Sequence, residues 1–190
     1  MPLESTTVET RRAFGFLFLC VSIAVGSGAI LSETAHLLDS PLYYHAIIWL
    51  ASFGIVFGAV FPKFRKVIPA IRQRMKTSAK WSSTAKALNA VTWAGPFLAI
   101  AAFPDLYQYL ILLGIGLGNM STYILIKRYS GNDNREQLIV AIVSLVALPV
   151  AVVIDSTIFA NSQDIAVMLS RILIAISYGA GGLFAFTGSK

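Results

Sequence analysis

Both histidines of this 190-residue chain lie in one short stretch, SETAHLLDSPLYYH, residues 32–45. Glu33 and His36 are three residues apart, a spacing that places both on one face of a helix, and His45 follows a loop that contains Asp39. Imidazole nitrogens with a carboxylate can bind zinc or copper, and two histidines can ligate haem. The residues Glu33, His36 and His45 are therefore a candidate metal site, whose cofactor stays unknown.

The same stretch also fits a hydrated loop at a membrane surface. Helical carboxylate–histidine metal sites normally contain a second Glu-x-x-His motif, and this chain has only one. Tyr43 and Tyr44 beside the histidines are typical of the aromatic belt that membrane proteins place at the lipid–water boundary. The loop interpretation is preferred, and the metal site is the alternative.

The elements that position this stretch are long apolar segments. The sequence is 56% hydrophobic and 13% charged, with a mean hydropathy of +0.72, which is unusual for a soluble domain. A membrane-spanning helix needs about 20 mostly apolar residues. The runs are continuous rather than alternating, so they do not resemble barrel strands. We expect an all-α, polytopic membrane protein, with a single integral membrane domain over residues 1–190 that forms a six-transmembrane-helix bundle, its helices near 13–32, 43–61, 86–103, 107–126, 137–158 and 165–187.

The basic residues indicate how this bundle is oriented. Cytoplasmic loops carry an excess of Lys and Arg, and the predicted spans place fourteen of the fifteen basic residues on one side. Both termini are then cytoplasmic, and the loops of the other side carry acidic residues without Lys or Arg. The net charge of +6 reflects this orientation. We expect the lipid bilayer as partner and no nucleic acid.

The amino-terminal segment has an alternative interpretation. The stretch TRRAFGFLFLCVSIAVGSGA has the basic start, short apolar centre and small residues of a signal peptide, and a cleaved chain would have five spans. An uncleaved helix is preferred because the apolar run continues through Ile30 and Leu31. Cys20 is the only cysteine and lies inside this helix, so no intrachain disulfide forms.

One segment outside the predicted spans, residues 62–83, combines apolar residues at helical spacing with a dense positive charge. Such a helix lies in the membrane interface against anionic lipid headgroups, or docks a partner protein. The alternative is that it is simply the largest cytoplasmic loop. Pro69 is expected to kink or restart the helix. The basic residues of this surface are Lys63, Arg65, Lys66, Arg72, Arg74 and Lys76.

Two glycine pairs predict close helix packing. Gly54 with Gly58, and Gly114 with Gly118, are four residues apart, a spacing that lets a neighbouring helix backbone approach. These faces can join helices of one chain, copies of a homo-oligomer, or other membrane subunits.

A single arginine lies inside a predicted span. Placing an arginine side chain at mid-bilayer costs at least about 2.5 kcal/mol. We therefore expect Arg171 to have an acidic partner, with Asp155 as the first choice and Glu33 as the second. Near the bilayer centre, Pro96 and Pro149 are expected to interrupt their helices and Asn119 offers a polar side chain. These residues predict a polar cavity with an outer gate at Arg171 and Asp155.

The function predicted first is a small carrier or channel for a solute or ion. The alternatives are a non-catalytic subunit or scaffold of a larger membrane complex, and a metal- or haem-binding oxidoreductase subunit that uses His36 and His45. The sequence contains none of the nucleophile–base, phosphate-loop or paired-aspartate patterns that intramembrane catalysis requires, so an enzyme is not favoured.

Overall fold

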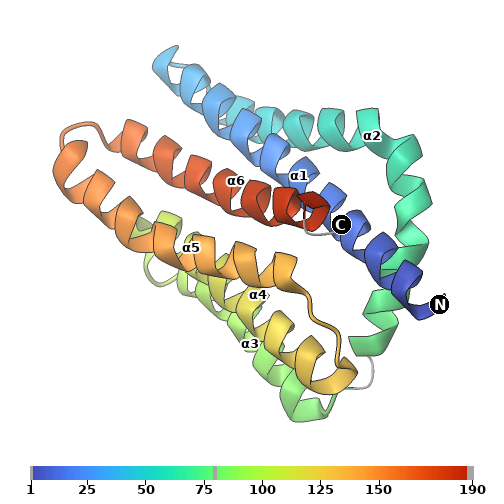
Figure 1. Cartoon of the computed structure of the whole chain (residues 1–190). Coiled ribbons are helices and arrows are strands. Elements are labelled where there is room, and N and C mark those ends of the chain that lie inside the picture. Colours follow the sequence, from blue (N-terminus) through green and yellow to red (C-terminus); the bar gives the residue numbers. More distant parts are fainter. Residues whose placement is uncertain (1, 79–80, 188–190) are drawn as a thin grey trace.

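The described residues form a bundle of six α-helices. Figure 1 shows this computed structural model. It describes residues 2–78 and 81–187, with the side chains of all of these except 2–9, 42, 64, 67, 70 and 73–78. The described residues contain no strand. The elements are α1 (Pro2–Leu37), α2 (Leu42–Ser78), α3 (Ser83–Ala99), η1 (Pro104–Leu106), α4 (Tyr107–Ser130), α5 (Arg135–Val153), the π-helix η2 (Ile154–Ile158) and α6 (Gln163–Thr187).

The helices pack in an open arc, in the order α2, α1, α6, α5, α4 and α3. Helix α1 packs against α2 and α6, α5 lies between α6 and α4, and α3 packs against α4. Extensive packing between α2 and α3 is missing from the described part of the chain, so the arc is open between these two helices (Figure 1).

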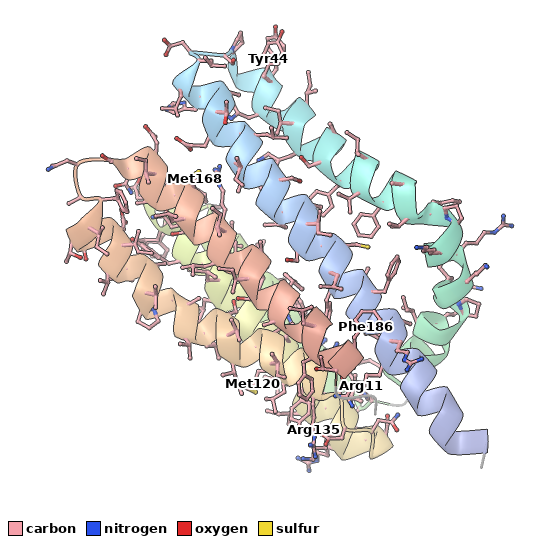
Figure 2. The ribbon with its side chains drawn as sticks, turned by 45° about the horizontal axis from the view of Figure 1, so that its top comes forward. Arg11, Tyr44, Met120, Arg135, Met168 and Phe186 are labelled. Atoms are coloured by element: carbon pink, nitrogen blue, oxygen red, sulfur yellow. The ribbon has the colours of Figure 1, made fainter. Side chains whose placement is uncertain are left out.

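The bundle has two ends. At the end that we name the α1–α2 end, the chain turns from α1 into α2 and from α5 into α6, and Tyr44 and Met168 lie there in Figure 2. At the opposite end, named the terminal end, the same view shows Arg11, Arg135 and Phe186. Helix α3 runs between the ends antiparallel to α4, because Trp81 packs against Leu125 and Ile126 late in α4, whereas Phe97 lies beside Gly114 early in α4.

Five of the described helices are long and apolar enough to cross a membrane by length and composition. Large hydrophobic side chains on their outer surfaces are exposed, such as Leu50, Ile55 and Leu183. These features fit a multi-pass membrane protein. The predicted count of six spans is not confirmed, because α3 has 17 residues and, at about 1.5 Å per residue, is shorter than the usual span. The five candidates are Thr10–Leu37, Tyr43–Lys63, Pro104–Ser130, Arg135–Ile158 and Gln163–Thr187.

The basic segment predicted over 62–83 is not a separate element. Helix α2 continues through Pro62 and Pro69 to Ser78, and its second half lies at an angle to the first (Figure 1). Four of the predicted surface residues, Lys63, Arg65, Lys66 and Arg72, are exposed. The side chains of Arg74 and Lys76 lie outside the described set.

The predicted breaks at the two central prolines are wrong. Helix α3 continues through Pro96 and α5 continues through Pro149. Pro96 is buried against Gly114, and Pro149 is exposed on the outer surface of α5. A proline lacks a backbone N–H and so frees the carbonyl one turn earlier, but Pro96 packs against α4 and Pro149 faces outward, so neither proline interrupts its helix beside a central cavity.

Glycines create the closest helix contacts. A Cβ added at Gly114 or Gly118 would lie 2.8 Å from Phe97 or 2.3 Å from Trp93, so this pair packs α4 against α3. Helices α1 and α6 meet through Gly15 and Gly182. A Cβ added at Gly54 or Gly58, in contrast, would meet no atom within 4 Å, so this pair packs no helix of the described chain.

Candidate functional site

A cavity of about 310 Å³ opens at the α1–α2 end of the bundle. Four helices line it: the end of α1, the start of α2, the start of α4 and the first turns of α6. We name it the Glu33–Arg171 cavity. Its volume is at the lower end of the range of small-molecule sites, roughly that of ten water molecules. The lining residues are Ser32, Glu33, His36, His45, Trp49, Tyr107, Asp164, Val167 and Arg171.

Glu33 brings a buried carboxylate to this cavity. Its exposed fraction is 5%, and its Oε1 atom has no hydrogen-bond partner among the described residues. A buried carboxylate oxygen without a partner is strongly unfavourable, so such atoms in native proteins usually meet a ligand, an ion or water. Glu33 is therefore the most chemically distinctive group of the cavity.

Arg171 faces the cavity from α6 and is held by aromatic rings. Its Nη2 donates a hydrogen bond to the Tyr107 hydroxyl at 3.2 Å, and its Cζ lies 5.9 Å from the Trp49 ring centre and 6.0 Å from that of Tyr107. Cation–π contacts at this distance stabilise a guanidinium by about 0.5–2 kcal/mol without neutralising its charge. Among the described side chains, no carboxylate oxygen lies within 4.0 Å of Arg171.

The predicted pairing of Arg171 with Asp155 is therefore wrong. Asp155 lies in the π-helix η2 and accepts hydrogen bonds from Tyr109 Oη and, at 3.2 Å, from Gln108 Nε2. The fully buried Gln108 and its neighbour Tyr109 thus tie α5 to α4. The second choice, Glu33, shares the cavity with Arg171 without reaching it.

The two histidines meet at the cavity but already have protein partners. His45 Nδ1 lies 2.8 Å from Ser32 Oγ, and His36 Nε2 lies 3.3 Å from Asp164 Oδ2. The two rings are 6.2 Å apart, and His36 and Asp164 are both mostly exposed. In the part of the chain that the structure describes, no group of three His, Cys, Asp or Glu side chains is placed to hold a metal. The candidate set Glu33, His36 and His45 is brought together, but not in a metal-binding geometry.

Asn119 does not line the Glu33–Arg171 cavity. Its exposed fraction is 2%, and its Nδ2 donates to the carbonyl of Ile115 at 2.9 Å. The adjacent glycines of α4 are filled by neighbours, with Leu145 against Gly116. The middle of the bundle at Asn119 is thus packed with side chains in this conformation.

Several residues of the site could not be singled out from the sequence. Trp49, Tyr107 and Asp164 look like ordinary boundary residues, because aromatic and acidic side chains are common where spans meet water.

At the terminal end, Glu136 was also missed. Its exposed fraction is 1%, and its Oε2 lies 3.9 Å from Arg11 Nε, while Arg11 Cζ lies 4.8 Å from the Phe184 ring centre. A glutamate near a predicted loop resembles a solvated residue, and only the packing shows its burial.

Comparison with protein-family models, curated proteins and solved structures finds no match for this chain. The residues of the cavity are therefore interpreted from their geometry and chemistry alone.

Proposed function

We propose that this protein is a carrier for a small polar solute, which it binds in the Glu33–Arg171 cavity. The observation that supports the proposal is one cavity that holds the buried Glu33, whose Oε1 has no hydrogen-bond partner among the described residues, and Arg171, which no described carboxylate approaches within 4.0 Å. A structural site would be expected to pair these two charges, because unpaired buried charge is costly. Keeping them apart around an open volume is useful only when a ligand supplies the missing contacts.

A carrier is favoured over a channel by the packing below the cavity. Asn119 is buried and hydrogen-bonded, and Gly114, Gly116 and Gly118 meet large side chains of the neighbouring helices. A channel needs a continuous path, whereas a carrier exposes its site to one side at a time. The open cavity at one end and the Arg11–Glu136 pair at the other fit one state of such a cycle.

The proposed topology has six spans with both termini in the cytoplasm. The position of Tyr107, the first residue of α4, supports this topology. Tyr107 lines the same cavity as Glu33 at the end of α1, so α3 returns the chain to the α1–α2 end. The basic residues then lie at the cytoplasmic, terminal end. The Glu33–Arg171 cavity opens to the outside in this arrangement.

Counterflow in vesicles tests the carrier. Liposomes that contain the purified protein would be loaded with one unlabelled solute at a time, chosen from small carboxylates, amines, amino acids and sugars. The uptake of the labelled form of that solute from the medium would then be measured. We expect the uptake of at least one solute to exceed its uptake by protein-free vesicles, and the Arg171→Gln variant to abolish this uptake. The exposed Arg128→Gln is the matched control and should transport normally. Equal uptake by Arg171→Gln and the wild type would contradict the assignment of the cavity.

A second candidate, a subunit that associates through α2, is favoured by the bare Gly54–Gly58 face. Small residues four apart are typical of helix–helix contacts in membranes, and this face meets no helix among the described residues. Crosslinking in native membranes, compared between the wild type and a Gly54→Leu, Gly58→Leu double variant, tests it. Association that persists in the double variant would exclude this face.

A further inference from the structure

We infer that the ligand of the Glu33–Arg171 cavity is a small zwitterion, a molecule with one ammonium and one carboxylate group. This inference rests on the proposed function, since it names the class of solute that the cavity would take. The cavity wall presents one unmatched negative group, one unmatched positive group and, between them, a limited volume.

Four other polar residues of the cavity already have partners within the protein. Ser32 lies at hydrogen-bond distance from His45, and His36 lies beside Asp164. Two opposite charges therefore remain for a ligand, the carboxylate of Glu33 on α1 and the guanidinium of Arg171 on α6. Their separation exceeds 4.0 Å, so they do not neutralise each other directly.

A ligand with a single charge would leave one of these groups uncompensated. A carboxylic acid would pair with Arg171 but leave the free Oε1 of Glu33, and add a second negative charge beside it. An amine would satisfy Glu33 but add positive charge near the guanidinium. An ammonium group against Glu33 with a carboxylate against Arg171 provides two charge-assisted hydrogen-bonded contacts and adds no net charge, so neither of the two groups is left uncompensated.

The arginine is already positioned for this role. Tyr107 holds one guanidinium nitrogen, and the Trp49 and Tyr107 rings lie against the Cζ atom. A guanidinium has five donors, so donors remain for a carboxylate. The volume of about 310 Å³ limits the ligand to a short molecule, such as a simple amino acid.

Matched ligands test the inference directly. The full-length protein in detergent would be titrated with glycine, β-alanine and 4-aminobutyrate, and in parallel with butyrate and butylamine, which each carry one of the two charges of 4-aminobutyrate. The measurement is the ligand-dependent shift of the thermal midpoint. We expect at least one zwitterion to stabilise the protein at concentrations where both single-charge compounds do not.

Variants assign the two contacts. Glu33→Gln and Arg171→Gln should each weaken zwitterion binding by at least about tenfold, whereas the exposed Asp105→Asn should leave it unchanged. Glu33→Asp keeps the charge and is the second variant if Glu33→Gln does not fold. It should retain the preference for zwitterions over butylamine.

The outcomes separate the ligand class from the carrier. If butyrate binds as tightly as 4-aminobutyrate and Glu33→Gln does not change this binding, the ligand is an anion and not a zwitterion. The carrier proposal would remain. A failure of every zwitterion to stabilise the protein would overturn the inference as well. Zwitterion binding without uptake in the counterflow assay would instead overturn the carrier and keep the ligand class.

Discussion

Glu33 and Arg171 show how the partner of a buried residue determines its role. Both are expensive inside a membrane, and in a purely structural site they would be expected to lie in contact. Arg171 instead packs among aromatic rings, and Glu33 retains an unsatisfied oxygen. In the proposed function, a ligand supplies the contacts that each of these two groups lacks among the described residues.

At the same scale, a single glycine is predicted to control the α1–α6 contact. In Gly182→Leu, the new side chain would begin 2.8 Å from Leu19 and 3.0 Å from the Gly15 carbonyl, and a backbone oxygen cannot move aside cheaply. We expect a loss of stability of about 1–3 kcal/mol, from overpacking. Thermal unfolding in detergent, followed by tryptophan fluorescence, measures it.

Gly54→Leu is the matched control for this substitution. Open space surrounds Gly54 within the chain, so the same leucine should change stability by no more than about 0.5 kcal/mol. Equal thermal shifts in the two variants would show that helix propensity, and not the close contact, determines the effect.

Among the elements, α1 connects the two ends of the bundle. Its last turns bring Glu33 to the cavity, and its third turn brings Arg11 to Glu136 at the start of α5. Between these points it packs along α6, where Ser22 Oγ donates to the Ala175 carbonyl at 2.6 Å. One continuous helix thus carries a residue of the Arg11–Glu136 pair and a residue of the cavity.

The pair at the terminal end is predicted to stabilise the fold. Arg11→Gln removes a cation 3.9 Å from a carboxylate with an exposed fraction of 1%, and we expect destabilisation of about 1–3 kcal/mol. The neighbouring exposed Arg12→Gln should have little effect. A double-mutant cycle with Glu136→Gln measures the coupling. A coupling near zero would show that the two side chains are neighbours without an energetic interaction.

For the whole molecule, the proposed six crossings place Asp105 and Arg72 on opposite sides of the membrane. A Cys20→Ala background removes the only native thiol, and single cysteines at Asp105 and Arg72 can then be labelled from each side of the membrane. We expect Asp105→Cys to react from outside and Arg72→Cys only after permeabilisation. Reaction of both from one compartment would contradict six spans, because α3 would then not cross.

The sequence by itself determined that the chain forms apolar helices, because continuous apolar runs of bilayer length exclude both strands and a soluble core. It also identified Glu33, His36, His45 and Arg171 as candidate site residues. Residue type and position in the sequence indicate which polar side chains are energetically unfavourable in or near a membrane. Which groups become partners was decided only by the tertiary structure. Pairing depends on how helices rotate and pack against one another, so Asp155 joined Gln108 and Tyr109, and Arg171 joined the aromatic residues.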